Sequence, residues 1–141
     1  MTIGRLIEGR GPVLTCDVST TVREAASLLA ERRIGALPVL ENGEIAGIFS
    51  ERDVIYRLHE FGPEMLNMLV GQVMTTPPVT VERDTSVMEA LSLITRRRVR
   101  HLPVVERGHM IAFVSIGDLV KYRIDKIESE AAAMRDYIQT A

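Results

Sequence analysis

RRRVRHLPVV, residues 96–105, is the stretch of the sequence that decides the fold, because a cluster of cationic side chains runs directly into an apolar segment typical of a buried strand. An earlier stretch, ERRIGALPVL at residues 31–40, has the same order, and its Pro38 aligns with Pro103. The same offset of 65 residues aligns residues 15–58 with residues 80–123 without a gap, with 16 identities in 44 positions. The chain is therefore a tandem repeat of one unit.

Composition and charge exclude several classes of protein. The 141 residues are 46% hydrophobic and 26% charged, which is typical of a globular domain rather than a disordered or fibrous chain. The net charge of −2 argues against nucleic acid or an anionic membrane as a general partner, and no apolar run is long enough to span a bilayer. The lone Cys16 excludes an intrachain disulfide, and the first residues lack the apolar core of a signal peptide, so we expect a cytoplasmic protein.

Each unit begins with an amphipathic helix. Thr21-x-x-Glu24 and Ser86-x-x-Glu89 are capping-box patterns, in which a hydroxyl and a carboxylate satisfy the free amides at a helix start. The apolar residues that follow recur at i, i+3, i+4 and i+7 and so line one buried face; they are Val22, Ala25, Ala26 and Leu29 in the first unit and Val87, Ala90, Leu91 and Ile94 in the second. Both helices should end near the arginines.

A hairpin and a second helix follow in each unit. Residues 37–40 and 45–49 flank Asn42-Gly43, a strong hairpin signal because both turn positions need positive φ. With short extended pieces at residues 13–16 and 79–81, and closing helices from Asp53 to about His59 and from Gly117 onward, each unit is predicted to be β-α-β-β-α. A short helix is expected at residues 64–70 of the connection.

The predicted fold is α+β, with two repeats packed as one pseudo-two-fold module and a C-terminal helix. Units of about 60 residues are too small to bury a comfortable core alone, so we expect one packed body rather than two independent domains. The expected organisation is repeat 1 at residues 10–60, a linker at residues 61–76, repeat 2 at residues 77–125 and a C-terminal helical extension at residues 126–141.

The segments GIFSERD (residues 47–53) and AFVSIGD (residues 112–118), each following a Leu-Pro-Val strand and a hairpin, resemble the signature of the cystathionine-β-synthase (CBS) domain. The chain is similar to a tandem pair, or Bateman module, of the stand-alone bacterial type. The resemblance covers residues 10–125, and its one departure is Ala112 where the family has glycine. It implies two clefts between paired sheets, which bind adenosyl effectors such as AMP, ADP, ATP, NAD or S-adenosylmethionine, and regulation rather than catalysis.

Asp53 and Asp118 are the candidate ribose ligands. A carboxylate one turn after a strand end can accept hydrogen bonds from both hydroxyls of a ribose. The alternative is helix N-capping, which the Ser-x-x-Asp spacing at a strand-to-helix junction also fits. Ser50 and Ser115 could cap their helices and donate to a phosphate, since a helix N-terminus favours anions.

The resemblance implies that each cleft combines residues of both repeats. The Asp118 cleft would use Thr15, Cys16, Ala36, Arg100, His101, Ser115, Ile116, Gly117 and Asp118, and the Asp53 cleft would use Gly35, Ala36, Ser50, Glu51, Arg52, Asp53, Pro78, Val79 and Thr80. Arg100-His101 replaces Gly35-Ala36 of the first repeat, so we favour the Asp118 cleft for a phosphorylated ligand. The preceding arginines are interpreted as a solvated helix end that complements the helix dipole.

No residue pattern supports catalysis or metal binding. The three histidines lack the spacing of a metal site, and neither a nucleotide-binding glycine motif nor a nucleophile elbow is present. We therefore expect a protein that is not an enzyme and holds no metal.

The C-terminal tail carries an apolar seam at Val120, Ile124, Ile127, Ala131, Met134 and Ile138, with balanced charges beside it. This favours self-association as a homodimer, and the alternative is packing on its own module. The predicted function is an adenine-nucleotide sensor that changes the arrangement of its repeats and so acts on an unidentified partner. An NAD-binding redox sensor and a ligand-free interaction scaffold remain alternatives.

Overall fold

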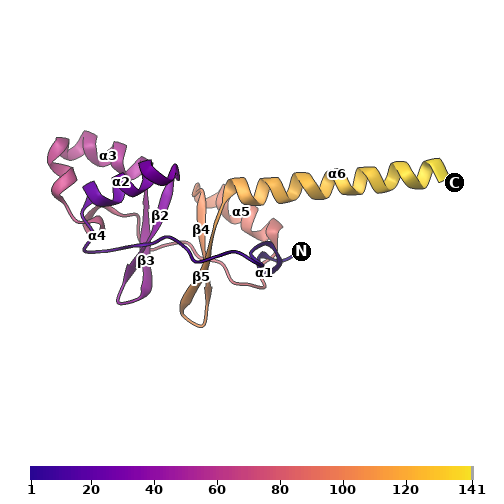
Figure 1. The fold of residues 1–141 in the computed structure, drawn as a ribbon, viewed down its shortest axis with the longest axis horizontal. Helices are drawn as coiled ribbons and strands as arrows, with labels where there is room; N and C mark the ends of the chain where they lie inside the picture. The colour runs from indigo at the N-terminus through magenta and orange to yellow at the C-terminus, as the bar shows by residue number, and fades with distance from the viewer. Residues whose placement is uncertain (141) are drawn as a thin grey trace.

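Two hairpins form the centre of the molecule, which is described by a computed structural model for residues 1–140 (Figure 1). Strands β2 (Ala36–Glu41) and β3 (Glu44–Ser50) pair antiparallel in the first repeat, as do β4 (His101–Glu106) and β5 (His109–Ser115) in the second. Asn42-Gly43 and Arg107-Gly108 all have positive φ, between 52° and 81°, as a tight hairpin turn requires. The two predicted hairpins are confirmed.

The helix before each hairpin is capped as predicted. Helix α2 (Val22–Arg32) begins at Thr21, whose hydroxyl accepts a hydrogen bond from the amide of Glu24. Helix α5 (Val87–Arg97) begins with a complete capping box between Ser86 and Glu89. Val22, Ala25 and Leu29 are buried in α2, and Val87, Ala90 and Ile94 are buried in α5, so both helices bury the predicted face.

The helix after each hairpin starts without a connecting loop. Helix α3 (Glu51–Phe61) follows β3 directly, and α6 (Ile116–Thr140) follows β5 directly. Both begin one or two residues earlier than expected, because Ser50 and Ser115 lie at the helix starts and bond to the residue three positions on. The connection holds a 3₁₀ helix η1 (Gly62–Asn67) and helix α4 (Val70–Val73) where one helix over residues 64–70 was expected.

The two sheets are small. Strand β1 (Cys16–Asp17) runs parallel to β2, with Cys16 beside Val39, and completes a sheet of order β1-β2-β3. The second sheet consists of β4 and β5, and Val81 adds a single parallel bridge to Val104. The predicted extended pieces at residues 13–16 and 79–81 thus pair only through their last residues. The sheets meet along β3 and β5, and the predicted α+β fold is confirmed.

Each repeat is completed by a four-residue helix, and for the second repeat this helix comes from the opposite end of the chain. Helix α1 (Ile3–Leu6), which was not predicted, packs on the second repeat (Figure 1), where the amides of Ile3 and Gly4 donate to the carbonyls of Thr85 and Arg83, both at 2.8 Å. Helix α4 occupies the equivalent place on the first repeat, where the amides of Val70 and Gly71 donate to Thr20 and Val18 at 2.8 and 3.0 Å. The segments that leave these helices must therefore cross the module.

The core consists of two clusters, each of which combines one repeat with the short helix that packs on it. The first includes Phe49, Leu37 and Val39 together with Met65, Val70 and Val73 of the connection. The second includes Leu102, Val104, Val114 and Leu119 together with Ile3 and Ile7. Within residues 1–140, no helix combines the length and the apolar composition needed to cross a membrane.

The crossing of the connection over β3 explains where the second signature departs from glycine. A Cβ on Gly47 would lie 2.7 Å from both the sulfur of Met74 and the carbonyl oxygen of Thr75, because Thr75 and Ile48 exchange backbone hydrogen bonds at 2.9 and 3.0 Å. In the second repeat the carbonyl of Phe113, equivalent to Ile48, instead accepts from the side chain of Arg10. Ala112 therefore stands where no reciprocal backbone pair requires a glycine.

We expect Gly47→Ala to lower the free energy of unfolding by about 1–3 kcal/mol, because the new methyl group overpacks a backbone contact that cannot move away. Urea denaturation measures the effect. Gly11→Ala is the matched control, since a Cβ at Gly11 meets nothing within 4 Å. Equal stability of the two variants would contradict the close crossing of β3.

Candidate functional site

Two cavities lie between the repeats, and each contains one of the predicted aspartates. The Asp53 pocket, of about 260 Å³, is lined by Gly35, Ile48, Ser50, Glu51, Arg52, Asp53, Tyr56, Thr75, Arg98, Val99, Arg100 and His101. The Asp118 pocket, of about 460 Å³, is lined by Arg10, Gly11, Pro12, Val13, Leu14, Ile34, Gly35, Ala36, His101, Ala112, Phe113, Ser115 and Asp118. Gly35 and His101 line both, so the cavities adjoin at these two residues.

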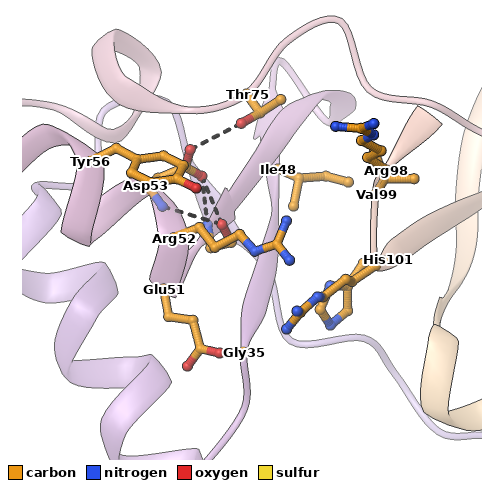
Figure 2. Close-up of a pocket in the computed structure, with 12 residues that line it drawn as sticks. Gly35, Ile48, Glu51, Arg52, Asp53, Tyr56, Thr75, Arg98, Val99 and His101 are labelled. Carbon is orange, nitrogen blue, oxygen red and sulfur yellow. Dashed lines mark hydrogen bonds between the residues drawn. The ribbon is translucent and has the colours of Figure 1, made fainter. Parts of the chain in front are cut away.

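Asp53 is held by its own chain. Its Oδ2 accepts from the amide of Ser50 at 2.8 Å and from the Ser50 hydroxyl at 3.2 Å, and its Oδ1 accepts from the Thr75 hydroxyl at 3.0 Å (Figure 2). Its exposed fraction is 9%. The carboxylate therefore caps helix α3, which is the alternative role considered for it, and its hydrogen bond with Thr75 connects the linker to α3.

Asp118 makes the equivalent cap but is more open. Its Oδ2 accepts from the amide of Ser115 at 2.9 Å and from Nη1 of Arg10 at 3.3 Å, and its side chain is 36% exposed. Within residues 1–140, no group donates a hydrogen bond to Oδ1 of Asp118. Partial burial acts to raise the pKa of Asp118, but the hydrogen bonds from Ser115 and Arg10 outweigh it and hold the pKa below its ordinary value.

Arg10 takes the place that Thr75 has in the other repeat. The two residues are separated by the repeat offset of 65, and each donates to the aspartate of its pocket. The difference is in charge, because Thr75 offers a neutral hydroxyl whereas Arg10 offers a cation. The Asp118 carboxylate is consequently neutralised by the protein itself in this structure.

Three arginines surround the Asp53 pocket. Arg52 extends from α3 across the cavity towards Val99 and His101, and Arg98 lies on the far side (Figure 2). Arg100 completes the lining. Among residues 1–140, none of the three lies within 4.0 Å of a carboxylate oxygen. The three cations therefore form no ion pair within the described residues, although the carboxylates of Glu51 and Asp53 also line the pocket.

The backbone at Arg98 explains why its side chain leaves the helix surface. Arg98 ends α5 in the left-handed conformation, with φ 55° and ψ 37°, and the equivalent Arg33 ends α2 in the same way. A helix commonly ends in this conformation, usually at glycine. Arg98 was interpreted as part of a solvated helix end; it is exposed at the end of α5, as expected, and it also lines the Asp53 pocket.

His101 lies between the cavities and stacks on Phe113, with ring centroids 5.3 Å apart and an interplanar angle of 12°. Burial lowers the pKa of His101 below 6.5, with Arg100 acting in the same direction and the carboxylates of Asp118 and Glu51 opposing it. Burial therefore favours the neutral form of the imidazole. The ring can offer a ligand a hydrogen bond and a flat surface.

The structure brings together most of the predicted residues but divides them differently. Arg100 lines the Asp53 pocket, although it was grouped with Asp118, because residues on either side of a strand entrance face different cavities. Ala36, His101, Ser115 and Asp118 lie together as expected, as do Gly35, Ser50, Glu51, Arg52 and Asp53. Thr15, Cys16, Ile116, Gly117, Pro78, Val79 and Thr80 do not line the cavities.

Cys16 illustrates a displacement of the predicted strand contacts by two residues. It is buried in the core of the first repeat, where burial and then the charge of Asp17 raise the pKa of its thiol to about 11. Val13 and Leu14 line the Asp118 pocket in place of Thr15 and Cys16. The sequence offered no signal for the crossing segments, because Arg10 and Thr75 lie outside the aligned residues 15–58 and 80–123 and differ in type.

Comparison with known proteins agrees with this architecture. The CBS domain family model matches residues 7–60 and 70–125. The CBS domain-containing protein CBSX3 of Arabidopsis thaliana, a mitochondrial protein, is 35% identical over 134 residues, which cover 92% of this chain and 65% of that protein. The chain thus spans slightly less than two thirds of the length of this relative.

Solved structures show the same fold. The CBS-domain containing protein ATU1752 from Agrobacterium tumefaciens has a TM-score of 0.82 at 32% identity, covering 87% of this chain and 99% of that chain. CBSX2, solved in complex with AMP, has a TM-score of 0.75 at 27% identity, covering 88% of this chain and 96% of that chain.

We expect Arg10→Ala to raise the pKa of Asp118 towards its ordinary value of 3.8, because the variant removes a hydrogen bond and a positive charge that favour the carboxylate. Carboxyl-carbon NMR across an acid titration measures the shift.

Because the pKa of Asp118 is lowered in the folded state, the contact between Arg10 and Asp118 stabilises the folded protein more at neutral pH than at acidic pH. The Arg10 contribution is present above the pKa of Asp118 in the unfolded chain and is lost as the pH falls through the pKa in the folded state. The pair should stabilise the protein by about 0.2–1 kcal/mol at neutral pH, because both side chains are about one-third exposed. Arg83→Ala, which breaks a pair with Glu106, is the control and should leave the Asp118 titration unchanged. An unchanged titration in Arg10→Ala would refute the contact.

Proposed function

The chain belongs to the CBS domain family, and from that premise we propose that it is a regulatory module that binds a phosphorylated adenosyl ligand between its repeats. The observation that carries this proposal is the group of three arginines around the Asp53 pocket, none of which forms an ion pair among residues 1–140. The AMP complex of CBSX2 supports an adenosyl ligand.

The phosphate end of the ligand is assigned to Arg52, Arg98 and Arg100. A planar guanidinium can donate two parallel hydrogen bonds to phosphate oxygens, and three such groups from both repeats would converge on one anion. The phosphorylated ligand is therefore proposed for the Asp53 pocket, rather than for the Asp118 cleft favoured by the sequence.

The Asp118 pocket is proposed as a second adenosyl site. Its apolar wall of Val13, Leu14 and Phe113 suits a base, and Oδ1 of Asp118 can accept from a ribose hydroxyl. Arg10, already at this carboxylate, is close enough to meet a phosphate. Ser115, at the start of α6, can contribute a hydroxyl.

Regulation requires that the ligand bind more tightly to one arrangement of the repeats than to another. The Asp53 pocket satisfies the structural condition, since Arg52 comes from the first repeat and Arg98 and Arg100 come from the second. A ligand that contacts all three would draw the repeats together. The surface offered to a regulated protein would change as a result.

Two alternatives each have one supporting observation. A dinucleotide such as NAD is favoured by the junction of the two cavities at Gly35 and His101, which could accommodate a ligand longer than a mononucleotide. A ligand-free scaffold is favoured by the hydrogen bonds that Thr75 and Arg10 make to the two aspartates. A homodimer is proposed with all three functions, and exposed Ile55, Tyr56 and Phe61 on α3 offer one apolar surface for it.

We expect AMP, ADP or ATP to raise the melting temperature, with a stabilisation of about 2.7 kcal/mol at a ligand concentration 100 times Kd. Differential scanning fluorimetry with these nucleotides, adenosine, NAD and S-adenosylmethionine measures the effect. Arg98→Ala should lose most of the shift with nucleotides and keep any shift with adenosine, because only phosphate contacts are removed.

Arg96→Ala is the matched control, since Arg96 lies in the exposed last turn of α5 and lines neither pocket. If none of these ligands shifts the melt, the regulatory proposal is wrong and the scaffold is favoured. If Arg98→Ala and Arg96→Ala respond alike, the assignment of the phosphate to the Asp53 pocket is wrong.

A further inference from the structure

The outer part of α6 has no support from the rest of the chain. Leu119 is the buried residue of this helix, and every residue from Ile124 to Thr140 is exposed. Figure 1 shows this part projecting away from both repeats. A helix of this length alone in water is marginally stable, because most helical stability in proteins comes from packing of an apolar face.

The projecting helix nevertheless carries such a face. Ile124, Ile127, Met134 and Ile138 are exposed by 49%, 48%, 59% and 66%, and with Val120 and Ala131 they recur at alternating steps of four and three residues. We name these six residues the α6 seam. The spacing is that of the a and d positions of a coiled coil, in which each seam residue packs between residues of a facing helix. The alternative, packing of this helix on its own module, does not hold from Ile124 onward, because every residue from Ile124 to Thr140 is exposed.

We infer that the α6 seam pairs with the α6 seam of a second copy, in a parallel two-stranded coiled coil. The charges beside the seam identify the occupant. Arg123 and Glu130 precede seam residues at a positions, and Glu128 and Arg135 follow seam residues at d positions. In a parallel pair, a residue that precedes an a position faces the residue five positions later on the other helix. Arg123 then meets Glu128 of the partner subunit, and Glu130 meets Arg135 of the partner subunit.

All the flanking pairs are attractive in this arrangement, and the two-fold symmetry doubles each of them. In an antiparallel pair of equal overlap, Glu128 would instead face Glu128 of the partner subunit, and Lys121 would face Arg135 of the partner subunit. Both of those contacts are repulsive. Within residues 1–140, none of these charges on α6 has an ion-pair partner, so all are free to pair between copies.

The inference is independent of the proposed ligand, because no seam residue lines either pocket. It assigns the proposed homodimer to the α6 seam rather than to the α3 surface. A parallel pair of α6 helices places both modules at the same end of the coiled coil, with the symmetry axis along the helices.

Sedimentation equilibrium of the full chain should give a dimer at micromolar concentrations. Glu128→Arg turns two attractive pairs into repulsive ones and should weaken the dimer about 10-fold at low salt. Arg123→Glu alone should do the same, and the double variant Arg123→Glu/Glu128→Arg should restore the affinity. A mixture of the two single variants should form heterodimers, in which the altered pairs are again attractive.

Cross-linking tests the parallel register. In Ile138→Cys the two new thiols face each other, so oxidised glutathione should convert the chain to a disulfide-linked dimer, whereas in an antiparallel pair they lie at opposite ends. Asp136→Cys, on the outer surface of the helix, is the matched control and should cross-link poorly. Cys16 is buried, with a pKa of about 11, and stays out of the reaction. A monomer at all concentrations, a dimer insensitive to the charge variants, or equal cross-linking of the two cysteine variants would overturn the inference.

Discussion

The exchange of two short helices between the repeats is the constraint on which the rest of the structure depends. Because α1 is hydrogen-bonded to the loop before α5, the chain from Ile7 to Cys16 has to run back across the module to reach β1. That crossing lays Arg10, Val13 and Leu14 along the Asp118 pocket. The connection after α4 crosses in the same way and brings Thr75 to Asp53. The pockets are thus formed by crossing segments as much as by the repeats.

The fold could be predicted wherever the signal was local. Capping boxes, i, i+3, i+4 spacing and Asn-Gly each specify an element through contacts between residues close in sequence, and the capping box and the helical spacing recur at the 65-residue offset. Helix α1 could not be found in this way, since four residues show no periodicity and its stability comes from Ile3 and Ile7 in the core of a repeat about 80 residues away.

The positions of the carboxylates in the candidate site could be predicted from the sequence, whereas those of the arginines could not. Asp53 and Asp118 follow from a strand ending directly in a helix, which the sequence displays twice. The direction of an arginine side chain beyond a helix end depends on the backbone conformation of that residue. Arg98 adopts the left-handed conformation, which the sequence does not indicate because the residue is not a glycine. The side of β4 that faces each pocket depends on how the two sheets meet, which the sequence does not specify. Arg100 therefore lies in the Asp53 pocket, although it was expected in the Asp118 cleft.

When paired in the proposed coiled coil, helix α6 connects one pocket to a distant point through a single rigid element. Asp118 lies in its first turn, and 25 residues at about 1.5 Å each give a rod of about 37 Å. A rotation of only ~5° about the Ser115–Asp118 junction would therefore sweep the far end through about 3 Å. A small shift of the Asp118 carboxylate would therefore become a larger displacement at the C-terminal end of α6. A molecule bound at that end would respond to ligand binding in the pocket without contacting the ligand.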